Sequence, residues 1–249
     1  MNQQQFQTFK KALLPGDIIL IGGGGFIADV IREGQAIADP SWTSQLSHAA
    51  FVQADGQISE STLSWRWDKI PTFPWFKINI SSGVQISDGA SWNDGEVLKW
   101  ICIVRLNGLT SATINAATAR GQELLAQKMF YPVRELVGDL ISETNYRFLG
   151  MLKWINPPYF EKCMKDLLLK KNPLDAKNAM YCCCYVNDCY QTAGTRLLPT
   201  TMDESNSKVG DLLKNKDTDY TLVFLEPSEL KPYSKTAGQD YSLNLDFVK

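Results

Sequence analysis

The chain has 249 residues, of which 44% are hydrophobic, and it carries a formal net charge of −2 at neutral pH. This length and apolar content suit one globular domain with a substantial core. The charge gives no electrostatic footprint for nucleic acid, and no stretch approaches the roughly 20 apolar residues of a membrane span. We therefore expect neither a nucleic-acid partner nor an integral membrane segment.

The N-terminal segment predicts a helix followed by a buried strand. A short amphipathic helix is expected over residues 5–14, then a turn at Pro15 and Gly16, and a continuous apolar strand over Ile18–Ile21. Gly22–Gly25 come next and lack the Lys-Ser or Lys-Thr of a phosphate-binding loop. We interpret these glycines as a flexible loop before a helix over Phe26–Ile31.

The only histidine, His48, lies in an apolar segment that is followed by an Asp-Gly pair and a second strand, a pattern typical of a β-hairpin. Glu60 on the second strand could orient its ring. A two-residue loop would pair Phe51 with Glu60 and place Glu60 and His48 on opposite faces. A three-residue loop, or a bulge at Gly56, restores a shared face. If Glu60 orients the His48 ring, the hairpin should therefore have a three-residue loop or a bulge at Gly56.

The rest of the chain up to the last strand predicts alternating short elements. A strand is expected over Val97–Leu106 and an alanine-rich helix over residues 111–128. Residues 195–220 are expected to form a polar loop region. The strand predicted over Tyr220–Leu225 is expected to be the last one.

Residues Tyr181–Gly194 predict a helix with a cysteine in its first turn. One face should carry Cys182, Val186, Cys189 and Ala193, the wetter side should carry Asn187, Asp188 and Gln191, and Gly194 should end the helix. Of the three adjacent cysteines, Cys182 alone combines the core-facing stripe with the helix N-terminus. Amide groups and the helix dipole favour a nucleophilic thiolate there. In the alternative interpretation, these cysteines are small buried apolar residues.

The cysteines also bear on redox state and metals. Four of the six crowd one helix, namely Cys182, Cys183, Cys184 and Cys189. Neighbours on a helix seldom have disulfide geometry, so we expect reduced thiols. Together with an N-terminus that lacks a signal peptide, this suggests a cytoplasmic location, with a phage particle as another setting. A zinc site is the weaker interpretation, because a second Cys-x-x-Cys-like pair is missing. We expect no metal and no cofactor.

Several motifs together resemble those of a known family. Ser47–Ala49, followed by a strand, Asp-Gly and Ile58–Glu60, resembles the histidine motif of the circularly permuted NlpC-type cysteine peptidases, the YiiX/YebB-like branch of the papain-like superfamily. Registering the family's cysteine motif on Ala193 and Gly194 places the family nucleophile on Cys182, while Cys183 and Cys184 replace the usual Ser and Glu. Further segments, Pro15–Leu20, Val104–Leu106 and Val209–Leu213, extend the resemblance over most of residues 12–226.

The resemblance implies an α+β, circularly permuted papain-like fold, in which an antiparallel sheet packs against helices and the nucleophile lies at a helix N-terminus. It implies one domain over residues 1–249, with inserted segments near 62–95 and 133–175. The implied activity is that of a thiol peptidase or amidase acting on peptidoglycan-type peptides or other amides, with Cys182 as nucleophile, His48 as base and Glu60 as its orienting partner. Related permuted members look like lipid acyl hydrolases or acyltransferases, so the partner is a peptide or acyl substrate.

Other residues are expected to border the substrate cleft of such an enzyme. They are Gly23, Gly24, Trp42, Ser47, Tyr131 and Tyr181. An ordinary packing role is the alternative for Trp42. The rival from another class of protein is a papain-like scaffold kept as a non-catalytic binding or structural module, for example in a phage particle.

Overall fold

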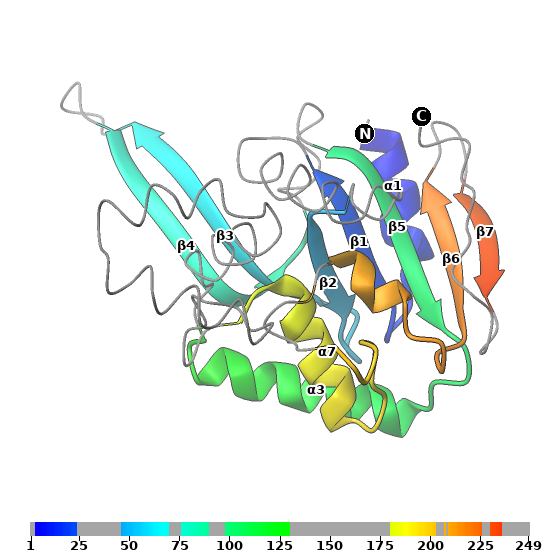
Figure 1. Cartoon of the computed structure of the whole chain (residues 1–249). Coiled ribbons are helices and arrows are strands. Elements are labelled where there is room, and N and C mark those ends of the chain that lie inside the picture. The colour runs from blue at the N-terminus through cyan, green and yellow to red at the C-terminus, as the bar shows by residue number, and fades with distance from the viewer. Residues whose placement is uncertain are drawn as a thin grey trace, which may run out of the picture.

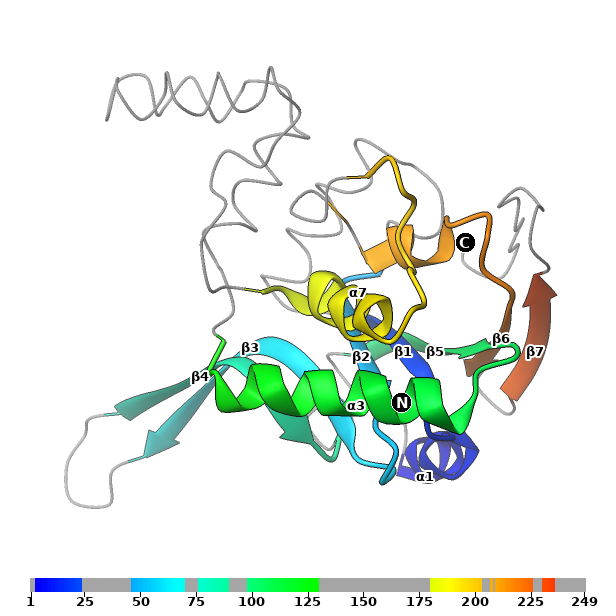
Figure 2. The same ribbon diagram turned by 90° about the horizontal axis from the view of Figure 1, so that it is seen from below.

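The computed structural model describes residues 3–23, 46–69, 76–89, 98–129, 180–202, 207, 209–225 and 230–235. Within them the protein has the expected α+β fold, with one antiparallel sheet and helices on both of its faces (Figures 1 and 2). The helix predicted over residues 26–31 and the insertion predicted near 133–175 lie outside the described residues.

The sheet has seven strands in the order β4-β3-β2-β1-β5-β6-β7, and every neighbouring pair is antiparallel. The strands are β1 Ile18–Gly23, β2 His48–Val52, β3 Ile58–Lys69, β4 Phe76–Ser87, β5 Leu98–Leu106, β6 Tyr220–Leu225 and β7 Leu230–Lys235. The prediction that Tyr220–Leu225 is the last strand is wrong, because β7 pairs with it. Pro232 and the lysines of β7 lack the pattern of a central strand, but a strand at a sheet edge tolerates them.

Three α-helices and one 3₁₀-helix accompany the sheet in the described ranges. They are α1 Gln3–Ala12, α3 Ser111–Ala126, α7 Cys182–Thr192 and the 3₁₀-helix η4 Val209–Leu213. All five residues of η4 are buried. The polar loop predicted over residues 195–220 therefore contains a segment of the core, which its local composition did not indicate.

The central strands are buried on both faces, which explains their continuous apolar sequence. Ile18 and Leu20 of β1 face the cluster formed with α3 and α7, whereas Ile19 and Ile21 face the cluster under α1. The same alternation runs through β2 and β5. Figure 2 shows α1 on one side of the sheet and α7 on the other. The nucleophile predicted on α7 thus approaches the sheet from the face opposite α1.

Helix α7 is held closely against α3 and the sheet. A Cβ atom added at Gly121 of α3 would lie 2.7 Å from the Tyr185 hydroxyl, so the glycine permits the close approach of the two helices. Nearby, Arg120 Nε donates to Asp188 Oδ2 at 2.7 Å, which links α3 to α7 by an ion pair. These contacts fix the position of α7.

Strands β3 and β4 have 12 residues each and form a ribbon that extends well beyond the neighbouring strand β2 (Figure 1). The insertion predicted near residues 62–95 therefore contains most of a two-stranded part of the sheet. The base of this ribbon, next to β2, carries Glu60.

Candidate active site

The hairpin between β2 and β3 has a three-residue loop, which is what a side-chain contact between His48 and Glu60 requires. The strands pair Ala50 with Glu60 and Val52 with Ile58, and Gln53 N–H donates to the Gln57 carbonyl at 2.8 Å, which leaves residues 54–56 as the loop. Gly56 has φ of 82°, a conformation that glycine adopts without strain. The predicted three-residue loop is therefore confirmed, and the alternation of side chains along the strands places His48 and Glu60 on the same face.

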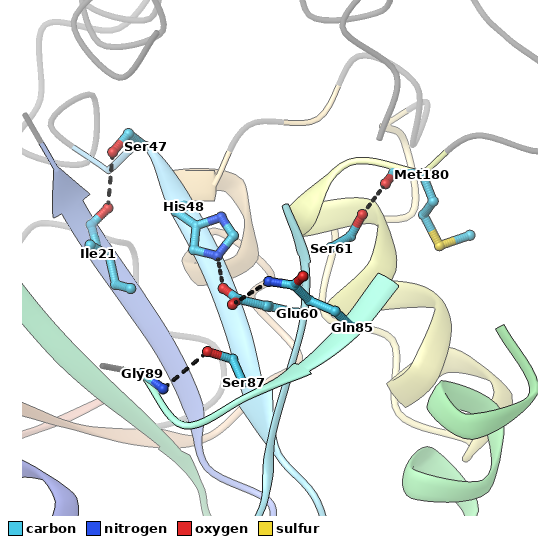
Figure 3. A network of polar contacts seen from close by, with 9 residues as sticks. All are labelled: Ile21, Ser47, His48, Glu60, Ser61, Gln85, Ser87, Gly89 and Met180. Carbon is cyan, nitrogen blue, oxygen red and sulfur yellow. Dashed lines mark hydrogen bonds and ion pairs between the residues drawn. The ribbon is translucent and has the colours of Figure 1, made fainter. Parts of the chain in front are cut away.

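The His48 ring meets the Glu60 carboxylate directly. The Nε2 atom of His48 lies 2.6 Å from Oε2 of Glu60 (Figure 3). The Glu60 side chain is 2% exposed and that of His48 is 17% exposed, so the contact is shielded from water on most sides. Since Nε2 faces Glu60, Nδ1 is the ring nitrogen left for the thiol.

Glu60 receives further hydrogen bonds from strand β4. Gln85 Nε2 donates to Glu60 Oε1 at 3.2 Å, and the Ser87 side chain also bonds the carboxylate. Burial works against the charged form, but the hydrogen bonds from His48, Gln85 and Ser87 outweigh it and hold the pKa of Glu60 below its ordinary value. Glu60 is therefore a carboxylate that stays ionised beside the ring.

Strand β3 also holds the start of helix α7. Its Ser61 hydroxyl donates to the Met180 carbonyl at 2.5 Å, and the Ser59 hydroxyl lies 2.5 Å from that of Tyr185 (Figure 3 shows the first contact). Ser59 and Ser61 lie on the face of β3 opposite to Glu60. One strand thus positions the Glu60 carboxylate with one face and helix α7 with the other.

Helix α7 begins at Cys182, as predicted, with Tyr181 as the N-cap residue. The pairing of β2 with β3 stops at Ala50 and Glu60, short of His48, and the two strands diverge there (Figure 1). At this open end of β2, Cys182 forms a hydrogen bond with His48 and another with the Ala49 backbone. The structure therefore brings Cys182, His48 and Glu60 together.

The electrostatics of the group favour a thiolate and an imidazolium. A hydrogen bond from Cys183 is the largest cause that lowers the pKa of Cys182; burial opposes it, and the hydrogen bond and charge of His48 lower that pKa further, to well below its ordinary value. Burial also opposes charging of His48, but the hydrogen bonds to Cys182 and Glu60 raise its pKa to about 10. Opposite charges in a poorly solvated site stabilise one another.

The neighbouring thiols have different surroundings. Burial raises the pKa of Cys183 well above its ordinary value, so Cys183 stays a thiol, and its Sγ lies 3.3 Å from the Ser207 carbonyl oxygen. Cys184 Sγ lies 3.6 Å from the Ser207 hydroxyl. Ser207 is a buried partner of this helix turn that sequence reasoning missed, because nothing in the local pattern around residue 207 marks it.

The residues predicted to border a cleft are placed as follows. The Ser47 hydroxyl donates to the Ile21 carbonyl at 3.4 Å, and the Tyr181 hydroxyl lies 3.4 Å from that of Ser207, so both side chains are directed at buried protein groups. Gly23 is the last residue of β1 and follows a register shift in its pairing with β5. Gly24, Trp42 and Tyr131 lie outside the described residues.

The prediction that Asn187 lies on the wetter side of α7 is wrong. Asn187 is fully buried, and its Oδ1 accepts hydrogen bonds from the backbone N–H groups of Leu197 and Leu198 at 3.1 and 3.0 Å. The helix is covered on this side by the chain that follows it, which helical periodicity alone does not reveal. Asp188 and Gln191 lie on more exposed positions, as predicted.

The five cysteines that the structure describes are free thiols, as expected. Across the same ranges no group of three or more His, Cys, Asp or Glu side chains has the arrangement of a metal site. No described helix has the length and apolar character needed to cross a bilayer. The chain matches no protein-family model, and a search of curated proteins finds no match.

Proposed function

We propose that the protein is a cysteine hydrolase in which Cys182, His48 and Glu60 form a catalytic triad. The observation that carries this proposal is the continuous line of hydrogen bonds from Cys182 through His48 to Glu60, supplied by α7, β2 and β3. A nucleophile, a base and a group that orients the base are the parts that nucleophilic acyl transfer needs. The lowered pKa of Cys182 and the raised pKa of His48 support the same assignment, because they favour the reactive ion pair.

In the acylation step, the Cys182 thiolate attacks the carbonyl carbon of an amide, and a carbon–sulfur bond forms. The carbonyl electron pair moves to oxygen, where the backbone N–H of Cys182 at the helix start is a candidate donor. Such a donor contributes roughly 3 kcal/mol to the transition state. The tetrahedral intermediate then collapses, the carbon–nitrogen bond breaks, and imidazolium His48 gives its proton to the leaving amine.

In the deacylation step, a water molecule attacks the thioester. Neutral His48 takes a proton from this water while Glu60 holds the ring in orientation. The carbon–sulfur bond breaks, a carboxylic acid leaves, and Cys182 returns as a thiolate beside the imidazolium. Water is the only co-reactant, so the complete cycle is the hydrolysis of an amide.

We also infer a more specific fold for the domain from the order of its elements. The histidine strand precedes the cysteine helix in the chain, and the nucleophile starts a helix that packs on an antiparallel sheet. Both features support a circularly permuted papain-like domain of the NlpC type over residues 1–249. The motif resemblance favours a peptide of the peptidoglycan type as the substrate, with other amides and acyl esters as the competing substrates.

Selective alkylation tests the nucleophile. We expect iodoacetamide at pH 6 to modify Cys182 first, as mapped by mass spectrometry, because most thiols are protonated at this pH. His48→Gln should slow this modification by roughly tenfold or more, since each pKa unit changes the thiolate fraction by about tenfold. Cys102 is the internal control, because burial raises its pKa. If Cys182→Ala leaves the labelling unchanged, the proposal is wrong.

Product analysis tests the substrate. Purified peptidoglycan and a set of acyl esters are each incubated with the wild-type protein and with Cys182→Ala. Released stem peptides that depend on Cys182 support the amidase assignment. Ester cleavage without peptide release identifies an acyl hydrolase that uses the same triad.

A further inference from the structure

A row of polar side chains crosses three strands at the candidate active site. His48 comes from β2, Glu60 from β3, and Gln85 and Ser87 from β4 (Figure 3). Gln85 is the direct partner of Glu60 in the β3–β4 register, and alternation puts both on the face that carries His48. Strand β4 therefore contributes to the site, although the motif comparison assigned none of its residues to it.

Each oxygen of the Glu60 carboxylate has its own partner. Oε2 lies 2.6 Å from His48 Nε2, and Oε1 accepts from Gln85 Nε2 at 3.2 Å. Ser87 adds another bond; its Oγ accepts from Gly89 N–H at 3.0 Å, which leaves the hydroxyl proton for Glu60. With 1% of Glu60 exposed, water could replace these partners only at a cost.

The geometry suits Gln85 to hold the orientation of the Glu60 carboxylate. A carboxylate held at one oxygen can rotate about its side-chain bonds, whereas one held at both oxygens keeps its orientation. Directly opposed residues of an antiparallel pair have Cβ atoms only about 5 Å apart, so the backbone itself sets the reach of Gln85. Hydrogen-bonding partners behind a reactive residue act by fixing such orientations.

We propose that Gln85 is a positioning residue of this site, whose amide holds one oxygen of Glu60 so that the other stays on the His48 ring. The proposal rests on the proposed function, because the orientation of His48 matters only if the ring serves Cys182. Gln85 contacts neither the thiol nor a substrate and acts through Glu60. Ser87 supports the same carboxylate from the next position on that face of β4.

The single histidine of the chain makes this proposal directly measurable. With the imidazole labelled with ¹⁵N and a purification tag that contains no histidine, every histidine signal in an NMR titration belongs to His48. The variants are Gln85→Met, which keeps the length of the side chain without a donor, and Gln85→Asn, which keeps the amide one methylene shorter. Ile86→Val is the matched control, because Ile86 is the next residue of β4 and faces the other side.

We expect Gln85→Met and Gln85→Asn to lower the proton affinity of His48 by about tenfold, which is one pKa unit. Alkylation of Cys182 by iodoacetamide at pH 6 should slow by a similar factor, while Ile86→Val matches the wild type in both measurements. Gln85 has no positioning role if His48 titrates in the folded Gln85→Met and Gln85→Asn variants as it does in the wild type, while Glu60→Gln shifts the His48 titration. A wild-type His48 that titrates at its ordinary 6.5 would instead overturn the triad itself.

Discussion

At the scale of single residues, His48 should show the strongest pH signature of the protein. Its pKa is raised to about 10, because the hydrogen bonds to Cys182 and Glu60 outweigh the opposing effect of burial. The fold therefore holds this proton more tightly than the unfolded chain does. Its contribution to stability is complete below the ordinary pKa of 6.5 and is lost as the pH rises through about 10.

We predict that Cys182→Ala lowers the pKa of His48 measured by NMR, because the thiolate that faces the ring is removed. The value should stay above 6.5, since the Glu60 carboxylate remains in contact with Nε2. The control is Cys102→Ala, in which a buried thiol elsewhere in the core is removed. Equal titrations in the wild type and Cys182→Ala would mean that the thiol and the ring do not interact.

We predict that Asn187→Leu destabilises the protein by about 2–6 kcal/mol. The substitution leaves the buried N–H groups of Leu197 and Leu198 without their acceptor, and each such loss costs about 1–3 kcal/mol. Urea unfolding followed by circular dichroism measures this cost. Thr192→Ala is the control at an exposed position of the same helix, and a comparable loss there would show that the acceptor role of Asn187 is not the cause.

These residues show what could and could not be predicted from the sequence. Helical periodicity identified Cys182 because a stripe of side chains and a helix start are local features. The buried position of Asn187 and the contact of Ser207 with the first turn depend on segments that return to the helix from later in the chain. Periodicity describes one helix at a time and holds no information about which segments cover it.

At the scale of elements, the register of the β2–β3 hairpin decides whether a triad can form. We predict that deletion of Ser59, with the three-residue loop over residues 54–56 kept, shifts Glu60 by one position relative to β2. The deletion would pair Phe51 with Glu60 and turn Glu60 away from the face of His48. Alkylation of Cys182 at pH 6 should then slow to the level of Glu60→Gln, while the circular dichroism spectrum keeps its strand content.

Ser59→Ala is the control for this deletion, because it removes the hydroxyl that contacts Tyr185 but preserves the register of the hairpin. It should keep the wild-type alkylation rate. A deletion variant that is alkylated as fast as the wild type would show that the register of this hairpin does not position Glu60.

The elements also differ in how well the sequence predicts them. The loop length was deduced from a chemical requirement, that Glu60 and His48 share a face. The ribbon of β3 and β4 was not foreseen, since the segment 62–95, with its interleaved prolines and aromatic residues, suggested an insertion rather than strands of the sheet. Gln85 was missed for the same reason, because its place opposite Glu60 exists only once β4 pairs with β3.

At the scale of the whole molecule, the candidate triad draws on both faces of the sheet. The thiol arrives with α7 on one face, while His48 and Glu60 lie on the other face, where α1 covers an apolar cluster with Phe6 and Phe9. Both clusters are needed for stability, but only the contacts among β2, β3, β4 and α7 set the charges of the site. Stability and reactivity should therefore respond to different substitutions.

We predict that Phe9→Ala destabilises the protein by about 3–5 kcal/mol, as expected for a phenylalanine whose side chain is fully buried. Thr8→Ala, at an exposed position of the same helix, should change the stability by less than about 0.5 kcal/mol. Both variants should retain the wild-type titration of His48 at temperatures where they are folded. If Phe9→Ala shifts that titration as far as Glu60→Gln does, packing under α1 helps to set the charge of the ring, and the contacts among β2, β3, β4 and α7 do not set it alone.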